Sequence, residues 1–118
     1  MASPLALAGI RVIELSGHYG GYCGKLFSGL GAEVTLVEPV GGSPLRRVGP
    51  FARATGESLN FAYQHTSKSS LVLDLNTDSA KDRLRELATG AHLVILADHP
   101  DREQIDFDAL LAANRAEW

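Results

Sequence analysis

The chain has 118 residues, 45% hydrophobic and 21% charged, which is ordinary for one globular domain, and we take residues 1–118 as that domain. Eleven Lys and Arg against 14 Asp and Glu give a net charge of −3. This charge argues against a nucleic-acid partner, because proteins that bind nucleic acids usually present a basic surface. No apolar run approaches the length that crosses a membrane, and we expect no signal peptide at the start of the chain.

The sequence contains a single cysteine, Cys23, so it predicts no internal disulfide and no Cys-x-x-Cys metal pair. This cysteine usage favours a reducing, cytoplasmic compartment. Because free cysteine is among the most buried residue types, we expect Cys23 to be a small buried residue on a helix rather than a nucleophile.

The first forty residues predict a strand, a loop, a helix and a second strand. Residues 10–15 and 33–38 are apolar and β-branched, as in buried parallel strands. Between them, 22–30 has the spacing of a helix that packs on a sheet, with apolar side chains at 22, 23, 26, 27 and 30. Gly31 follows where a helix end requires a positive φ. This order is typical of a βαβ unit with a right-handed crossover.

The rest of the chain continues the alternation after a surface loop at 39–58 that is rich in Gly, Pro and Ser. The further elements are a short helix at 59–65, a strand at 69–75, a helix at 78–89 capped by Thr77 or Asp78, a strand at 92–97 and a helix at 106–116 capped by Asp106. The predicted core positions on these helices are Leu84, Leu87, Ala88, Leu110 and Leu111. The pattern predicts an α/β fold with a Rossmann-like parallel sheet and flanking helices. No closing strand is evident, so we expect the sheet to be incomplete.

The loop between the first two strands has the spacing G-x-x-G-G-x-x-G from Gly17, and such a loop can present backbone N–H groups to a phosphate. Glu38 lies near the spacing expected for an acid that binds a ribose. The spacing is nevertheless neither the dinucleotide fingerprint nor a P-loop, so a nucleotide site and a purely structural turn both remain open. His18 and Tyr19 lie at the loop tip, at the sheet edge where ligands bind in open α/β sheets.

The remaining polar candidates each have two interpretations. Arg46, Arg47 and Arg53 could bind phosphates or only make the long loop soluble. Lys68 could reach a phosphate or lie on the surface. Asp74, inside an apolar strand pattern, could accept hydrogen bonds from a turn or from a ligand. No metal-ligand spacing, nucleophile elbow or other catalytic set is present, and we expect no metal.

The order of segments resembles the N-terminal part of the family III CoA-transferases, which include carnitine and formyl-CoA transferases and 2-methylacyl-CoA racemases. The similar segments are LAGIRVIELS, LGAEVTLVEP, KSSLVLDL and HLVILADHPDR, and together they cover the chain from Leu7 to about Asn114. The resemblance implies a Rossmann-like domain that takes coenzyme A or an acyl-CoA as substrate, in subunits that interlock. It also implies that the catalytic aspartate, which takes up the acyl group, lies beyond these residues.

Carried over position by position, the resemblance implies CoA contacts in three segments. The implied contacts are His18 and Tyr19 after the first strand, Leu73, Asp74, Leu75 and Asn76 after the third, and Ala97, Asp98, His99 and Arg102 after the fourth.

Three functions therefore stay open. The leading one is the CoA-binding or acyl-CoA-binding segment of a CoA-transferase or acyl-CoA racemase. The second is a non-catalytic domain that docks on a partner chain or on a further copy of itself. The third is a fragment that binds a nicotinamide nucleotide, supported by Glu38 and the loop glycines.

Overall fold

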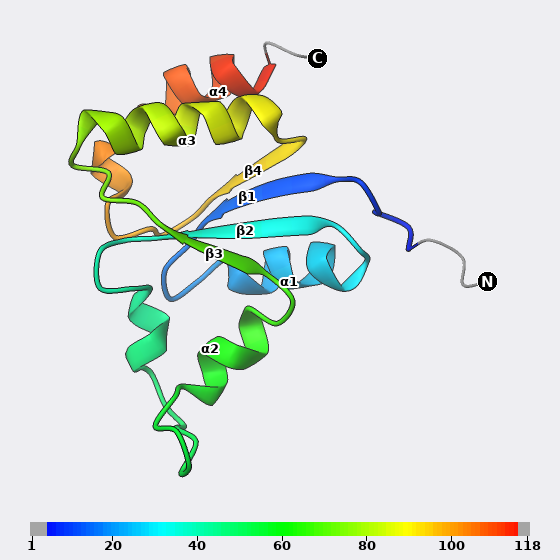
Figure 1. The fold of residues 1–118 in the computed structure, drawn as a ribbon, viewed down its shortest axis with the longest axis vertical. Helices are drawn as coiled ribbons and strands as arrows, with labels where there is room; N and C mark the ends of the chain where they lie inside the picture. The colour runs from blue at the N-terminus through cyan, green and yellow to red at the C-terminus, as the bar shows by residue number, and fades with distance from the viewer. Residues whose placement is uncertain (1–4, 116–118) are drawn as a thin grey trace.

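The computed structural model describes residues 5–115, and its centre is a four-stranded, all-parallel sheet with helices on both faces (Figure 1). The strands are β1 (Arg11–Leu15), β2 (Glu33–Glu38), β3 (Ser69–Val72) and β4 (Leu93–Leu96), in the order β3-β2-β1-β4. The helices are α1 (Gly21–Gly29), α2 (Leu59–Gln64), α3 (Asp78–Gly90) and α4 (Phe107–Arg115), with 3₁₀ helices at Pro44–Arg47 and Arg102–Gln104. The α/β fold and its parallel sheet are thus confirmed.

The central strand β1 separates two apolar clusters because successive side chains of a strand point to opposite faces. Ile13 and Leu15 pack against α3 and α4, whereas Val12 packs against the opposite layer, where α1 lies. The first cluster also contains Val37, Leu75, Ala80, Leu84, Ala88, Ala91 and Leu110. The predicted core positions on α3 are confirmed, but Leu111 on α4 is 37% exposed.

Several helix ends form as predicted. The Thr77 side chain accepts a hydrogen bond from the N–H of Ala80 at the start of α3, and the Asp106 side chain accepts one from the N–H of Ala109 in α4. Gly31 has a φ of +101° just after α1. The predicted C-terminal helix extended to residue 116, which lies outside the described residues.

The predicted orientation of α1 is wrong in part. The helix packs on the sheet with its small residues and with Phe27, and its other large apolar residues face outward. The buried residues are Gly21, Gly24 and Ser28, while Tyr22, Leu26 and Leu30 are each more than half exposed. Cys23 is exposed as well, so the expectation that it is buried is also wrong.

Two segments differ in extent from the prediction. The strand β3 ends at Val72 rather than at 75, because Asp74 begins a turn there, in which its carboxylate accepts from the N–H of Asn76. The predicted loop at 39–58 contains the 3₁₀ helix at Pro44–Arg47 and a bridge between Phe51 and Ser58. Together with α2 this segment projects away from the sheet at the bottom of Figure 1.

Candidate functional site

The predicted contact residues all follow the carboxyl ends of parallel strands, so they lie along one edge of the sheet. The loop after β1 and the turn after β4 are neighbours, because these two strands pair directly. Residues 73–76 follow β3, which is separated from β4 by β2 and β1. The chain after β4 nevertheless reaches back toward this side, because Leu75 lines one hollow with Gln104, Ile105 and Asp106. The structure therefore places the loop after β1 beside the turn after β4, with residues 73–76 further along the same edge.

The loop after β1 is held to the turn after β4 by Asp98. One carboxylate oxygen of Asp98, Oδ1, accepts hydrogen bonds from the N–H of Gly17 at 2.9 Å and of Tyr19 at 3.1 Å. The other oxygen, Oδ2, is also 3.1 Å from the Tyr19 nitrogen. Partial burial raises the pKa of Asp98, but these backbone hydrogen bonds outweigh it and hold the pKa below its usual value.

After β1 and β4, three of the predicted contact side chains are open to a ligand. His18 is exposed, and Tyr19 beside it is 76% exposed. Their rings are 6.4 Å apart between centroids and tilted by 59°. Arg102 is exposed and donates one hydrogen bond to the carbonyl oxygen of Ala97, which leaves the rest of its guanidinium free to bind an anionic group.

Two other predicted contact residues are closed to a ligand. Leu75 is fully buried in the core, and His99 is 2% exposed. His99 accepts a hydrogen bond on Nδ1 from the N–H of Asp101, and its burial lowers the pKa of the ring. Any contact that these two residues make with a ligand in this conformation must therefore come from backbone atoms.

The carboxylate of Glu38 is already satisfied within the protein. It is 2% exposed and forms a two-point ion pair with Arg46, at 2.6 and 2.9 Å, and accepts hydrogen bonds from the Ser43 N–H and the Ser70 hydroxyl. Burial raises the pKa of Glu38, but these donors outweigh it and lower the pKa to about 2. Glu38 is thus not free to bind a ribose, and the nicotinamide-nucleotide hypothesis loses its main support.

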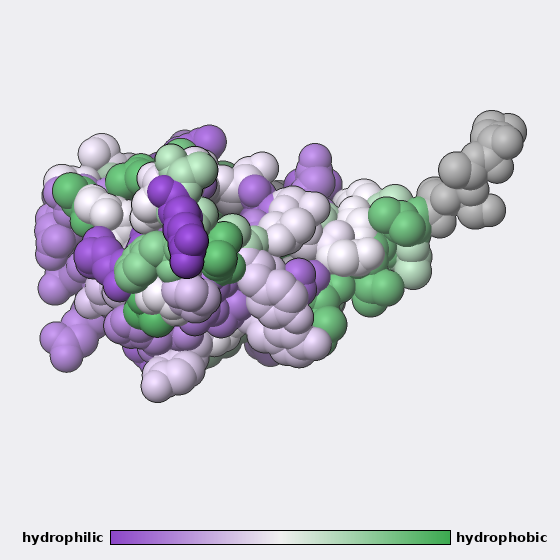
Figure 2. Space-filling model, turned by 90° about the horizontal axis from the view of Figure 1, so that it is seen from below, coloured by the Kyte–Doolittle hydropathy of each residue, from purple (hydrophilic) through white to green (hydrophobic). Residues whose placement is uncertain are grey.

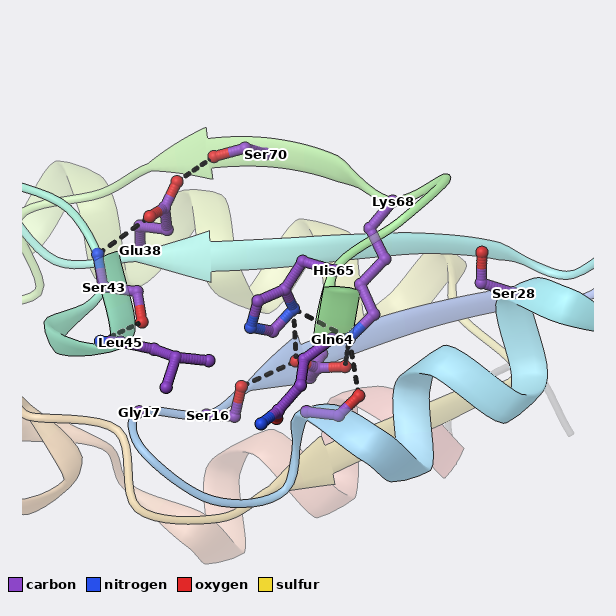
Figure 3. A network of polar contacts seen from close by, with 12 residues as sticks. Ser16, Gly17, Ser28, Glu38, Ser43, Leu45, Gln64, His65, Lys68 and Ser70 are labelled. Carbon is purple, nitrogen blue, oxygen red and sulfur yellow. Dashed lines mark hydrogen bonds and ion pairs between the residues drawn. The ribbon is translucent and has the colours of Figure 1, made fainter. Parts of the chain in front are cut away.

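A buried ionic network under α1 was not predicted (Figure 3). The Lys68 ammonium donates to Glu14 Oε1 at 2.7 Å, to the Gly21 carbonyl oxygen at 2.8 Å and to His65 Nδ1 at 2.8 Å. The Ser16 hydroxyl donates to the other Glu14 oxygen at 2.6 Å. Burial lowers the pKa of Lys68, and the Glu14 carboxylate offsets this only in part. The interpretations of Lys68 as a phosphate ligand or a surface residue are therefore wrong.

The signal for this network was the acid in the middle of an apolar strand. Glu14 is fully buried, and a charge in that position requires a partner of opposite sign. The identity of the partner could not be read from the pattern, because Lys68 lies 54 residues further along the chain.

Within residues 5–115 the structure has no helix long and apolar enough to span a membrane, and no group of three His, Cys, Asp or Glu residues that could hold a metal ion.

Comparisons with known proteins agree on one family. The sequence profile of CoA-transferase family III matches residues 7–116. The BbsE subunit of succinyl-CoA:(R)-benzylsuccinate CoA-transferase from Thauera aromatica is 38% identical over 93 residues, which are 76% of this chain and 23% of that protein. The beta subunit of succinyl-CoA–L-malate CoA-transferase from Chloroflexus aurantiacus is 37% identical over 98 residues, or 80% of this chain and 23% of that protein.

The fold agrees as well. A solved structure of a CAIB/BAIF family protein from Brucella suis superposes with a TM-score of 0.81 at 27% sequence identity, over 95% of this chain and 32% of that one. The chain thus spans about a quarter of the length of these curated relatives and about a third of this solved chain.

Proposed function

Because the chain belongs to CoA-transferase family III, we propose that it supplies the part of such an enzyme that binds the CoA thioester at the carboxyl edge of the sheet. The observation that carries this proposal is the open group formed by His18 and Tyr19 after β1 and Arg102 after β4, on two paired strands. A guanidinium binds phosphate groups, and an exposed aromatic ring can stack on a base.

The spread of the predicted contacts fits a long ligand. Residues 73–76 follow β3, and the other predicted contacts follow β1 and β4, so together they extend along the carboxyl edge of the sheet. An extended CoA thioester is long enough to contact several loops of this edge. We therefore propose that Leu73–Asn76 contact a different part of the same CoA molecule.

The transfer step itself needs a carboxylate that takes up the acyl group, as nucleophilic catalysis requires. Among the described residues, Asp98 and Glu14 are engaged by donors within the protein. We propose that the nucleophile lies in the longer part of the polypeptide that the relatives carry beyond the matched segment, and that the enzyme uses a CoA donor and a carboxylate acceptor.

Titration calorimetry and thermal denaturation with CoA, acetyl-CoA and NADH test the binding proposal. We expect CoA and acetyl-CoA to raise the melting temperature, by linkage worth about 2.7 kcal/mol at a hundred times the Kd, and NADH to have no effect. Arg102→Ala should weaken CoA binding about ten- to a hundredfold, since a hydrogen bond to a charged group contributes about 1.5–3 kcal/mol.

The matched control for Arg102 is Arg83→Ala, an exposed arginine on α3, which should bind CoA like the wild type. If no CoA compound raises the melting temperature at millimolar concentration, the binding proposal is wrong.

A second role, as a docking module, is favoured by apolar surfaces that the described residues leave open. The outward stripe of α1 consists of Tyr22 and Leu26, and Leu30 continues it directly after the helix. The strand β4 is an edge of the sheet, and hollows of about 240 and 530 Å³ adjoin it, lined by Leu93, Leu96, Phe107, Leu111 and Asn114 among others. Figure 2 shows hydrophobic atoms at the right-hand end of the described residues. We propose that the longer part of a family III polypeptide packs on these surfaces.

Co-expression of the tagged chain with the complementary part of the Thauera aromatica relative tests this packing. We expect a 1:1 complex by light scattering, and Leu26→Glu should weaken it on the order of tenfold or more, because burial of one leucine side chain contributes about 1.5–3 kcal/mol. Glu33→Ala, an exposed polar position on β2, should leave the complex intact. Failure of the wild-type chain to associate would refute the packing proposal.

A further inference from the structure

A hollow of about 270 Å³ lies between α3 and α4, the two helices that pack together at the top of Figure 1. The described residues that line it do not include the proposed CoA contacts His18, Tyr19 and Arg102, so the hollow is a separate feature of the molecule. Its apolar lining consists of Leu75, Leu84, Ile105, Ala109 and Leu110.

The apolar lining belongs to the core that α3 and α4 share with the sheet. Leu84 and Leu110 are buried there, and Ile105 packs against them half-buried. Ala109, on the α4 side, contributes only a methyl group, which leaves the space beside it open. An apolar group that enters this space leaves water and meets carbon atoms of both helices, and such burial is favourable.

The rim of the hollow carries positive charge that the protein leaves largely unused. Lys81 is half-buried, and its ammonium forms no ion pair with any residue in 5–115. Arg85 is exposed and lies 3.4 Å from the Asp82 carboxylate through one nitrogen, which leaves its other N–H groups free. Asp106 is the one carboxylate in the described lining, and it already accepts the N–H of Ala109. Two cations against one engaged carboxylate favour an anionic group at this rim.

From this arrangement we infer that the hollow between α3 and α4 binds a small amphipathic anion, a carboxylic acid with a short apolar chain. The chain lies against Leu84 and Ile105, and the carboxylate accepts hydrogen bonds from Lys81 and Arg85. The volume lies just below the range of about 300–1,000 Å³ that holds drug-sized ligands, so the acid is small. This inference goes beyond the proposed function and does not rest on it.

Titration of the ¹⁵N-labelled chain with hexanoate, followed by two-dimensional ¹⁵N–¹H NMR at pH 7, tests the inference. We expect the amide signals of Leu84, Ile105 and Ala109 to shift and to saturate at millimolar hexanoate. Hexylamine has the same chain with the opposite charge, and acetate has the same head group without the chain. Each should bind on the order of tenfold more weakly or less, because each lacks one of the two attractions.

Three variants separate the roles of the rim and of the hollow. Lys81→Met should weaken hexanoate binding on the order of tenfold, because it removes a hydrogen bond to a charged group. The matched control is Arg83→Met, an exposed cation of the same helix outside the hollow, which should bind hexanoate like the wild type. Ala109→Leu fills the hollow, keeps both cations and should abolish the shifts. If Ala109→Leu does not fold, Lys81→Met and hexylamine still decide the question.

Equal binding of hexanoate and hexylamine, or equal binding of hexanoate by Lys81→Met and the wild type, would overturn the inference. Displacement of hexanoate by CoA at the same amides would overturn it too, because the hollow would then be part of the CoA site. Saturable hexanoate shifts in a chain that does not bind CoA would support this inference and contradict the proposed function alone.

Discussion

At the scale of single residues, Glu14 organises the layer between the sheet and α1. It is fully buried, and its two carboxylate oxygens accept hydrogen bonds from Lys68 and Ser16. Lys68 in turn donates to the Gly21 carbonyl oxygen, so the pair ties β1 to the start of α1 and to the segment before β3. A buried pair of this kind contributes little net stability, but loss of one partner leaves an uncompensated charge.

Replacement of Lys68 by methionine should therefore destabilise the protein strongly. Glu14 would remain buried without its cation, with the Ser16 hydroxyl as donor and the His65 ring 3.6 Å away, and we expect a loss of about 3–5 kcal/mol in the free energy of unfolding. Urea denaturation measures this loss. Lys25→Met, which removes an exposed cation–π contact with Tyr63, is the control and should cost no more than about 1 kcal/mol. Equal losses in the two variants would contradict the prediction.

His65 makes stability depend on pH. Burial and, secondly, the charge of Lys68 lower the pKa of His65 to about 4, from 6.5 in the unfolded chain. The unfolded state therefore binds more protons between these values, and the free energy of unfolding falls as the pH drops from about 6.5 to about 4. Between these two pH values, His65 changes the free energy of unfolding by about 1.4 kcal/mol per pH unit.

Replacement of His65 by glutamine, which can still accept from Lys68, should reduce this slope. Part of it should remain, because burial also lowers the pKa of His99. Urea denaturation at a series of pH values between 7 and 4 provides the measurement. The exposed loop residue His18 serves as the control, since His18→Gln should keep the wild-type slope. A His65→Gln slope as steep as that of the wild type would exclude His65 as its source.

At the scale of elements, α1 shows why a helix pattern alone did not give its orientation. Its apolar residues have helical spacing, and that spacing predicts a helix but not which neighbour the stripe meets. The buried ion pair of Glu14 and Lys68 lies directly beneath the helix, so only a face of small residues can approach the sheet there. Phe27 still reaches the core, whereas Tyr22 and Leu26 are left exposed on the outer side of the helix.

Two glycines in α1 should respond in opposite ways to alanine. A Cβ on Gly24 would overlap the Glu14 carboxylate and lie 3.0 Å from Lys68 Nζ, so Gly24→Ala should cost about 1–3 kcal/mol by overpacking. Gly29 has no atom within 4 Å of such a Cβ, so Gly29→Ala should be neutral or stabilise by up to about 1 kcal/mol through helix propensity. Thermal denaturation compares the two variants. If Gly24→Ala left the melting temperature unchanged, the side chains of Glu14 and Lys68 would have moved to make room for the Cβ, and the prediction would be wrong.

At the scale of the whole molecule, the sheet is well covered at its centre and more open at its two edge strands, β3 and β4. β1 pairs with a strand on each side, and its residues from Val12 to Leu15 are buried. All four residues of β4 are half-buried, and the strand pairs only with β1. Parallel sheets are normally buried on both faces, and the half-buried β4 is consistent with the packing on this side that we propose above.

Hydrogen exchange should reveal this asymmetry. We expect the amides of β1 to exchange most slowly and those of β4 to exchange faster, because local opening is easiest where few apolar contacts hold a strand. Mass spectrometry of the chain alone, and of its complex with the complementary part of the Thauera aromatica relative, measures the effect. Protection of β4 should rise on complex formation, with β1 as the internal control. If the exchange rates of β4 were the same in the complex as in the chain alone, the partner would not cover β4, and the prediction would be wrong.

The sequence by itself determined the alternation of strands and helices, the parallel sheet, the caps at Thr77 and Asp106 and the family resemblance, because these depend on local spacing and on residues close together in the chain. Only the tertiary structure decided which polar groups meet. Asp98 reaches the β1–α1 loop across 81 residues, and Lys68 reaches Glu14 across 54. Such pairs form because the sheet brings distant strand ends together and buried charges must then find partners, which no local pattern records.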